Sequence, residues 1–228
     1  MKRLFFTLIL SSSLSMSHDL WVEREGSQYA LYYGHLHPVQ GEERFIKYKP
    51  EDVLKFECVS SSGKVVQYKF EKSYPAKLKG SCSAVLALFS SGYWTKSVEG
   101  LKNLPKDRVQ GAIEGWLSYE SVKRIDSWSQ ELKRPLTDDL EIVPLGNPLE
   151  AKIGDKLTFA VYYRGKPLKD AVVAYDEKPV GSTDDEGRIN IRIKRKGLQL
   201  ISTSVKEKAD GVKADYVVKT ANLSFEVK

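Results

Sequence analysis

All three histidines of the chain lie within residues 18–37, near its N-terminus. His18 opens the run His18-Asp19-Leu20-Trp21, and His35 and His37 flank Leu36. Imidazole nitrogen is a preferred ligand of zinc, copper, iron and nickel ions. A chain of 228 residues has many other positions for its histidines. The clustering therefore predicts a transition-metal site.

Residues 1–17 have the features of a secretory signal peptide. Lys2 and Arg3 form a basic start, the segment 4–10 is apolar, and the segment 11–17 is rich in serine. This order of regions is typical of signals that are cleaved after a small residue. Cleavage after Ser17 would make His18 the first residue of an exported, periplasmic protein. No later segment has the roughly 20 consecutive apolar residues of a membrane-spanning helix.

Cleavage at this point changes the chemistry of His18, because its free α-amine and its imidazole Nδ1 can hold one ion together. His35 and His37 are two residues apart, so on a regular strand their side chains share a face. These nitrogen donors suit Ni²⁺, Co²⁺ or Cu²⁺ rather than Ca²⁺ or Mg²⁺. Asp19, Glu42 and Glu43 are near in sequence and are candidates for extra ligands or for orienting the rings.

Two alternatives remain open at the histidines. Cleavage after Ser15 would place His18 third, an arrangement that binds Cu²⁺ or Ni²⁺ in a square plane through the amine, two amides and the imidazole. Without a metal, His35 would cap a hairpin and His37 would be a turn residue before Pro38.

The sequence does not predict an enzyme. It contains no GxSxG or HExxH motif, and no histidine outside residues 18–37 to act as a general base. The catalytic alternative is a copper oxidase with a "histidine brace", since those enzymes place an N-terminal histidine and a second histidine on a β-sandwich.

Cys58 and Cys82 form an even pair in a chain predicted to be exported, which favours a disulfide. The formal net charge of +6 is spread along the chain. Its richest cluster, Lys194-Arg195-Lys196, precedes Gly197 and is typical of a solvated hairpin end. Nucleic-acid binding would require a basic stripe with interleaved aromatic residues, and the sequence has none.

The hydrophobic pattern predicts an all-β protein of two sandwich-like domains. Residues 18–98 and the segment after Leu149 alternate apolar and polar residues between turn signals. Within the first of these, the continuous apolar run at 84–89 predicts a buried central strand. Apolar residues at helical spacing predict one or two short helices at about 106–132. We expect an N-terminal domain at 18–145 and a C-terminal, prealbumin-like or immunoglobulin-like sandwich at 146–228.

Five short runs, taken together, resemble one family of exported proteins. The runs are His18-Asp19-Leu20-Trp21, Tyr33-Gly34-His35, Gly92-Tyr93-Trp94-Thr95-Lys96, Leu140-Glu141-Ile142-Val143-Pro144 and Ala221-Asn222-Leu223-Ser224-Phe225-Glu226-Val227. The family is the periplasmic accessory component of nickel and cobalt energy-coupling-factor transporters (NikK-type, a domain-of-unknown-function family). The resemblance spans nearly the whole mature chain. It implies a β-rich periplasmic protein that works beside a membrane transporter.

The sequence therefore predicts a periplasmic protein that binds Ni²⁺ or Co²⁺ as cargo and assists its uptake by the transporter. The alternatives are a copper-dependent oxidase that uses the same nitrogen donors, and an extracellular structural or interaction module that binds no metal.

Overall fold

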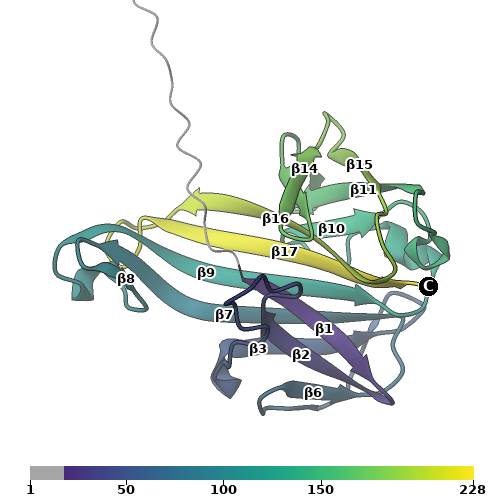
Figure 1. Ribbon diagram of the computed structural model, residues 1–228, viewed down its shortest axis with the longest axis horizontal. Coiled ribbons are helices and arrows are strands. Elements are labelled where there is room, and N and C mark those ends of the chain that lie inside the picture. Colours follow the sequence, from purple (N-terminus) through teal and green to yellow (C-terminus); the bar gives the residue numbers. More distant parts are fainter. Residues whose placement is uncertain (1–17) are drawn as a thin grey trace, which may run out of the picture.

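The computed structural model describes residues 18–228, which form three β-sheets and four short 3-10 helices. The expected all-β, sandwich-like fold is confirmed. A nine-stranded sheet forms the middle of the molecule, with a small sheet against each side (Figure 1). The predicted signal peptide, residues 1–17, lies outside the described residues. No helix within residues 18–228 is long and apolar enough to cross a membrane.

The first small sheet has the order β1-β2-β6-β5. Its strands are β1 (Asp19–Glu25), β2 (Gln28–Gly34), β6 (Ala76–Lys79) and β5 (Phe70–Glu71). The second small sheet contains β10 (Glu141–Pro144), β11 (Lys156–Tyr163), β12 (Lys166–Pro167) and β15 (Arg188–Arg192). The 3-10 helices are η1 (Pro50–Asp52), η2 (Lys106–Arg108), η3 (Gln130–Lys133) and η4 (Pro148–Glu150).

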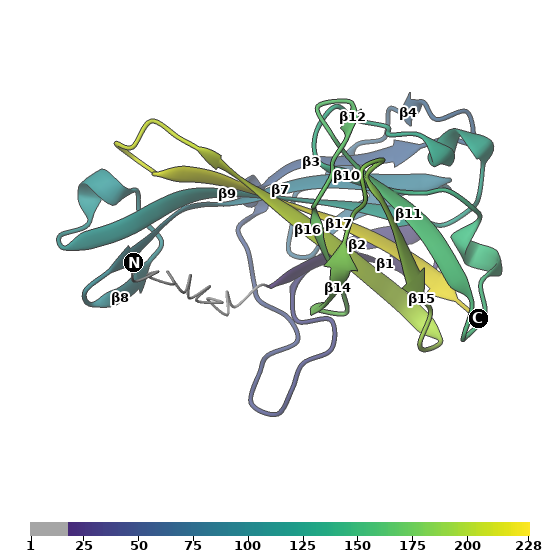
Figure 2. The same cartoon turned by 90° about the horizontal axis from the view of Figure 1, so that it is seen from above.

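The nine-stranded sheet has the order β14-β13-β16-β17-β9-β7-β3-β4, and β8 also pairs with β7. Its strands are β14 (Lys178–Ser182), β13 (Val172–Tyr175), β16 (Gly197–Lys208), β17 (Tyr216–Val227), β9 (Ala112–Ile125), β7 (Ala84–Ser97), β3 (Val53–Val59), β4 (Val65–Val66) and β8 (Gly100–Lys102). Figure 2 shows its long strands crossing the small sheets and continuing beyond them.

Strand β7 separates two hydrophobic cores. Ala84 and Leu86 pack into one core, whereas Val85, Ala87 and Phe89 pack into the other. Successive side chains of a strand point to opposite faces, so a continuous apolar run is required where both faces are covered. The buried central strand predicted from this apolar run is therefore confirmed.

The prediction of short helices at about 106–132 is wrong for most of that segment. Ala112–Ile125 forms strand β9, and only the 3-10 helices η2 and η3 flank it. Val122 and Ile125 face different cores and Ile113 is 57% exposed, so the residues at helical spacing do not form one buried stripe. Pairing with β7 on one edge and β17 on the other determines the conformation, since context commonly overrides a short pattern.

The two halves of the chain share the nine-stranded sheet, because β17 pairs in parallel with β9. The predicted boundary near residue 146 therefore crosses a continuous sheet. The two hydrophobic cores divide the chain near residue 125. One core uses residues between 20 and 122, and the other consists mainly of residues from 125 onward together with Val59 and Ala84.

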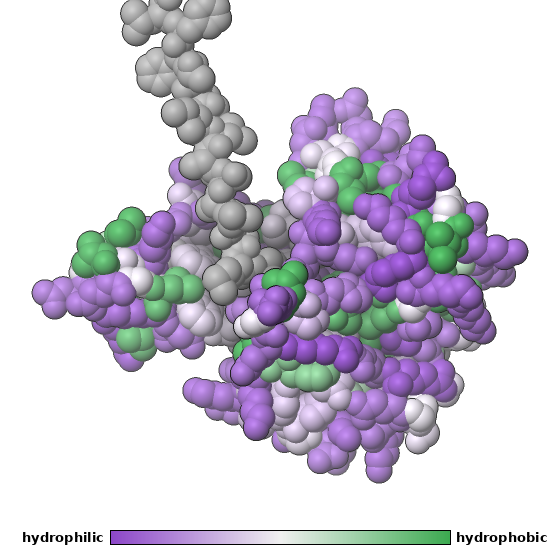
Figure 3. Space-filling view, viewed as in Figure 1, coloured by the Kyte–Doolittle hydropathy of each residue, from purple (hydrophilic) through white to green (hydrophobic). Residues whose placement is uncertain are grey.

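Exposed apolar side chains gather at the end of the molecule that carries β8 (Figure 3). They come from β8, the start of β9, the loops on either side of β8 and the loop between β16 and β17. The residues are Val98, Leu101, Leu104, Ile113 and Val212.

The predicted disulfide is present between Cys58 of β3 and Cys82, which precedes β7. These neighbouring antiparallel strands bring the two cysteines together. Both cysteines are buried in the core beneath β1 and β2.

Reduction of this disulfide should lower the free energy of unfolding by on the order of 3 kcal/mol, because the bond closes a loop of about 25 residues in the unfolded chain. Urea titration of oxidised and reduced protein measures the difference. The double substitution Cys58→Ala with Cys82→Ala should unfold at the same urea concentration with and without reductant. Equal stability of the oxidised and reduced natural protein would contradict this prediction.

Candidate metal centre

The β1–β2 hairpin brings His18 and His35 together. Asp19 pairs with Gly34 at the open end of the hairpin, so the residue before β1 and the residue after β2 lie next to each other. The two imidazole rings meet edge to face, with their centroids 5.1 Å apart. His35 is 7% exposed and His18 is half-buried.

Gly34 allows the chain to turn directly after β2. Its φ is +143°, and a Cβ atom at this position would lie 2.2 Å from the carbonyl oxygen of Arg44. The backbone N–H of His35 donates to that same carbonyl oxygen, at 3.0 Å. Residues 35–44 therefore fold back into a closed loop that fixes the backbone of His35, and any larger residue in place of Gly34 would disrupt it.

Two carboxylates face His35 from separate parts of the chain. Glu177 Oε1 lies 3.4 Å from His35 Nδ1, and Glu42 Oε2 lies 3.8 Å from the same nitrogen. Carboxylate oxygens beside imidazole nitrogens form a mixed set of donors that divalent transition metals accept.

Asp19, the first residue of β1, is a third carboxyl group near His35. Its side chain accepts a hydrogen bond from the backbone N–H of Leu36, at 3.2 Å. Burial, followed by a hydrogen bond with Glu177, raises the pKa of the Asp19 carboxyl. Two neighbouring carboxyl groups repel each other when both are ionised, so they share a proton. A bound cation could replace that proton.

Glu177 is held there by an unusual turn between β13 and β14. Asp176 and Glu177 have φ values of +48° and +62°, as in the two-residue type I′ turns that favour Asn, Asp and Gly. Glutamate in this conformation is strained by on the order of 1 kcal/mol or more, and such strain is concentrated at functional sites. Sequence reasoning missed Glu177 because it lies 142 residues from His35.

His18 also contacts Tyr33 of β2, whose ring packs against Phe89 of the nine-stranded sheet. Its Nδ1 lies 3.2 Å from the hydroxyl of Tyr33. Burial, followed by the neighbouring His35, lowers the pKa of His18. This favours the neutral imidazole, which is the form that binds metals.

Glu120 of β9 is the hydrogen-bond partner of Tyr33. Sequence reasoning also missed this residue, because residues 106–132 were expected to be helical. Its carboxyl group is buried, and Oε2 has no hydrogen-bond partner among the described residues. Burial raises the pKa of Glu120 to about 8, against the opposing effect of a hydrogen bond with Tyr33. Glu120 therefore approaches the histidine pair through Tyr33, whose hydroxyl lies 3.2 Å from His18 Nδ1.

The substitution Glu120→Gln should stabilise the protein by several kcal/mol at pH 8 and have little effect at pH 4. The folded state keeps the proton of Glu120 up to a pKa of about 8, whereas the unfolded state loses it near the ordinary value of 4.5. The stability that this proton gives is present below pH 4.5 and is lost as the pH rises toward 8.

Urea unfolding of both proteins across this range measures the effect. Glu114→Gln, on the same strand but partly exposed, is the control and should not change the pH profile. A Glu120→Gln protein that loses stability with rising pH as the natural protein does would contradict the prediction.

His37 lies apart from the other two histidines. Its Nε2 is 2.5 Å from Arg195 Nη2 and 3.6 Å from Asp176 Oδ1. Burial, followed by the charge of Arg195, lowers its pKa. Since Nε2 accepts the hydrogen of a guanidinium group, this nitrogen is occupied and lies in a cationic environment that disfavours a metal ion.

The expectation that His35 and His37 share one face of a strand is wrong, because β2 ends at Gly34 and the histidines lie in an irregular loop. Leu36 anchors this loop. Its side chain is 5% exposed and packs with Trp21 and Leu200, while the flanking histidines contact different partners.

Of the predicted neighbours, Asp19 and Glu42 lie in the His18–His35 group. Glu43 makes no ion pair with a histidine in the described part of the chain. Within residues 18–228, no group of three or more His, Cys, Asp or Glu side chains has the arrangement of an assembled metal site. The group of His18, His35, Asp19, Glu42 and Glu177, called the histidine cluster below, is therefore an open arrangement of donors.

A family model described as "Domain of unknown function (DUF4198)" matches residues 14–207. The chain belongs to this family. The matched range contains both the β1–β2 hairpin and the β13–β14 turn, and thus every member of the histidine cluster. No curated protein and no solved structure matches the chain. Membership in the family assigns no activity.

Proposed function

We propose that the protein binds Ni²⁺ or Co²⁺ at the histidine cluster and passes the ion to a membrane transporter of the energy-coupling-factor type. The observation that carries this proposal is the meeting of two imidazoles at the open end of one hairpin, with ring centroids 5.1 Å apart and a strained Glu177 beside them.

The donor set agrees with this cargo. Two imidazoles and carboxylate oxygens suit nickel, cobalt and copper, whereas a site for Ca²⁺ or Mg²⁺ would be built from oxygen alone. The α-amine of His18, if cleavage follows Ser17, adds a nitrogen ligand. The histidine cluster is partly open, which suits a site that must release its ion. We therefore propose a carrier and not an enzyme.

The transporter and the periplasmic location come from the resemblance of the sequence motifs and from the predicted signal. The Cys58–Cys82 disulfide supports export, because disulfides persist in oxidising compartments.

A copper-dependent oxidase is the second candidate. One observation favours it: His18, predicted to be the N-terminal residue, lies against a second histidine on a β-sheet scaffold, which resembles the histidine brace. The same donors would then hold a redox-active copper ion.

Calorimetric titration of protein that starts at His18 with Ni²⁺, Co²⁺ and Cu²⁺ tests these functions. The carrier predicts one tightly bound Ni²⁺ or Co²⁺ per chain. Tight binding of Cu²⁺ with oxygen consumption that depends on a reductant would favour the oxidase. Binding of none of the three ions would overturn both and favour a structural or interaction module.

The substitution Glu177→Gly should separate stability from metal binding. Glycine adopts the conformation of Glu177 without strain, so stability should stay unchanged or rise by up to about 1 kcal/mol. Loss of the carboxylate should weaken Ni²⁺ binding about tenfold or more.

Urea unfolding and calorimetry of the Glu177→Gly protein measure the two effects. Glu186→Gly, in an exposed turn away from the histidines, is the control for binding. Unchanged Ni²⁺ affinity in Glu177→Gly would remove Glu177 from the site.

A further inference from the structure

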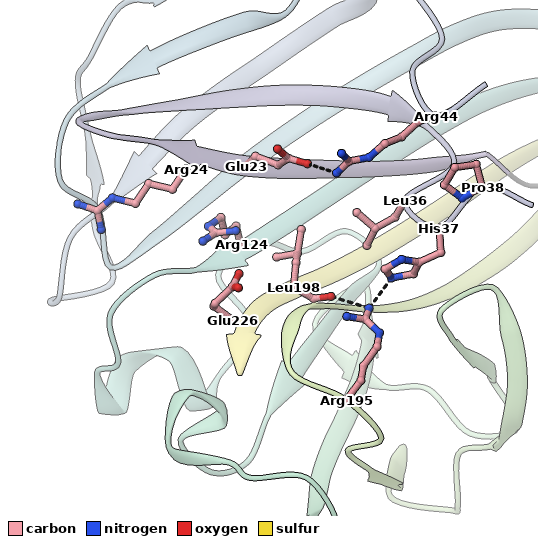
Figure 4. Close-up of a pocket in the computed structure, with 10 residues that line it drawn as sticks. All are labelled: Glu23, Arg24, Leu36, His37, Pro38, Arg44, Arg124, Arg195, Leu198 and Glu226. Carbon is pink, nitrogen blue, oxygen red and sulfur yellow. Dashed lines mark hydrogen bonds and ion pairs between the residues drawn. The ribbon is translucent and has the colours of Figure 1, made fainter. Parts of the chain in front are cut away.

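A cleft of about 860 Å³ lies beside His37, between β1, the loop of residues 35–44 and the start of β16 (Figure 4). Four arginines from separate parts of the chain line it. They are Arg24, Arg44, Arg124 and Arg195. Glu23 and Glu226 are the acidic residues of the lining, so the guanidinium groups exceed the carboxylates by two.

All four arginines already have acidic partners, and Arg24 and Arg124 share Asp126. Arg24 pairs with Asp126, Arg44 Nη2 lies 2.7 Å from Glu23 Oε1, and Arg195 Nη2 lies 2.8 Å from Asp176 Oδ1. The side chains of Arg24, Arg44 and Arg195 remain 30–44% exposed. The ion pairs therefore orient the guanidinium groups. Arg195 keeps one Nη1 hydrogen for a ligand, because its Nε and Nη2 donate to Asp176, His37 and Leu198 and its Nη1 donates once to the carbonyl oxygen of Lys196.

Arg124 differs from the other three because it is buried, with 5% of its surface exposed. Its Nη1 donates to the carbonyl oxygen of Val22 at 3.1 Å, and its Nη2 lies 3.4 Å from Asp126 Oδ1. Its Nε has no hydrogen-bond partner among the described residues. A buried guanidinium group with an unpaired donor is costly to maintain, and an oxyanion in the cleft would accept a hydrogen bond from this donor.

The remaining residues of the lining suit the hydrocarbon part of an organic ligand. Leu36, Pro38 and Leu198 contribute apolar surface between the arginines. A cleft of this volume is also far larger than an inorganic anion and lies in the size range of pockets that hold small organic molecules. Arginine binds planar carboxylates through two parallel hydrogen bonds.

We propose that this cleft binds a small organic anion with two or three carboxylate groups. Arg44 and Arg195 bind the carboxylates at opposite sides, Arg124 provides buried positive charge, and Leu36 and Leu198 contact the carbon skeleton. The proposal does not depend on metal binding, because no member of the histidine cluster lines the cleft.

Calorimetric titration of metal-free protein with citrate, succinate and inorganic phosphate at low ionic strength tests the proposal. We expect one citrate per chain, with phosphate at least tenfold weaker. Arg44→Ala should weaken citrate binding at least tenfold, since Arg44 is exposed and its loss should not unfold the protein. Glu226→Gln should tighten binding, because it removes a negative charge from the lining.

Arg164→Ala is the matched control, since Arg164 is exposed, pairs with Glu207 and lies outside the lining of the cleft. It should bind citrate as the natural protein does. Absence of citrate binding, or equal losses in Arg44→Ala and Arg164→Ala, would overturn the proposal. Phosphate binding as tight as citrate binding would overturn the assignment to organic carboxylates. None of these results bears on Ni²⁺ titration, so the two sites can fail separately.

Discussion

The substitution His35→Ala should weaken Ni²⁺ binding by about 100-fold or more in protein that starts at His18. His35 is buried, and its ring faces both His18 and Glu177, so its loss removes a nitrogen donor that no other side chain replaces. A factor of 100 corresponds to about 2.8 kcal/mol of binding free energy, a reasonable loss for one ligand when changes around the ligands alone cost 10–100-fold.

The control for this experiment is His37→Ala, which should change Ni²⁺ affinity by less than about twofold. His37 Nε2 accepts a hydrogen bond from Arg195 and lies in the cationic cleft. Calorimetry of the two variants side by side distinguishes this assignment from a site built on all three histidines. Equal losses in both variants would contradict it, as would a larger loss in His37→Ala.

The substitution Glu141→Ala should destabilise the fold by about 3–5 kcal/mol, because it leaves a buried charge without its partner. Glu141 Oε1 of β10 lies 2.5 Å from Lys123 Nζ of β9. The side chain of Glu141 is 6% exposed and that of Lys123 is 3% exposed. The same carboxylate accepts hydrogen bonds from the backbone N–H groups of Leu136 and Thr137. This ion pair therefore connects the segment before β10 to the nine-stranded sheet.

Urea unfolding measures this loss. Glu114→Ala, which breaks a partly exposed ion pair with Lys206, should cost no more than about 1 kcal/mol. Adding Lys123→Met to Glu141→Ala should restore part of the lost stability, since the unpaired buried charge is then gone. If Glu141→Ala is no more destabilising than Glu114→Ala, the buried pair does not stabilise the fold as described.

The sequence predicted those parts of the fold that depend on local pattern. Alternating apolar residues identified strands such as β1 and β2, and the continuous run before Phe89 identified a strand covered on both faces. Cys58 and Cys82 identified the disulfide because chemistry and compartment leave few alternatives. The pattern around Ile113 and Trp116 was misleading, because the strands on both sides of β9 are distant in sequence and determine its conformation.

The candidate site was also predicted only in part, because local pattern fixes some of its residues and long-range contacts fix the others. The hairpin register explains why His18 meets His35, and that register follows from the short turn at Gly26. Sequence reasoning missed Glu177, which is 142 residues from His35, and Glu120, which lies in a segment that was expected to be helical. The position of His37 depended on the end of β2 and on Arg195, 158 residues away, and neither is visible in the spacing of the histidines.

Nickel anomalous diffraction tests the proposal that the histidine cluster holds a transition metal. Crystals of protein that starts at His18, grown with one equivalent of Ni²⁺, are measured at the nickel absorption edge. We expect one strong anomalous peak between the rings of His18 and His35, within coordination distance of Glu177. A peak at His37 or elsewhere, with none between these two rings, would contradict it.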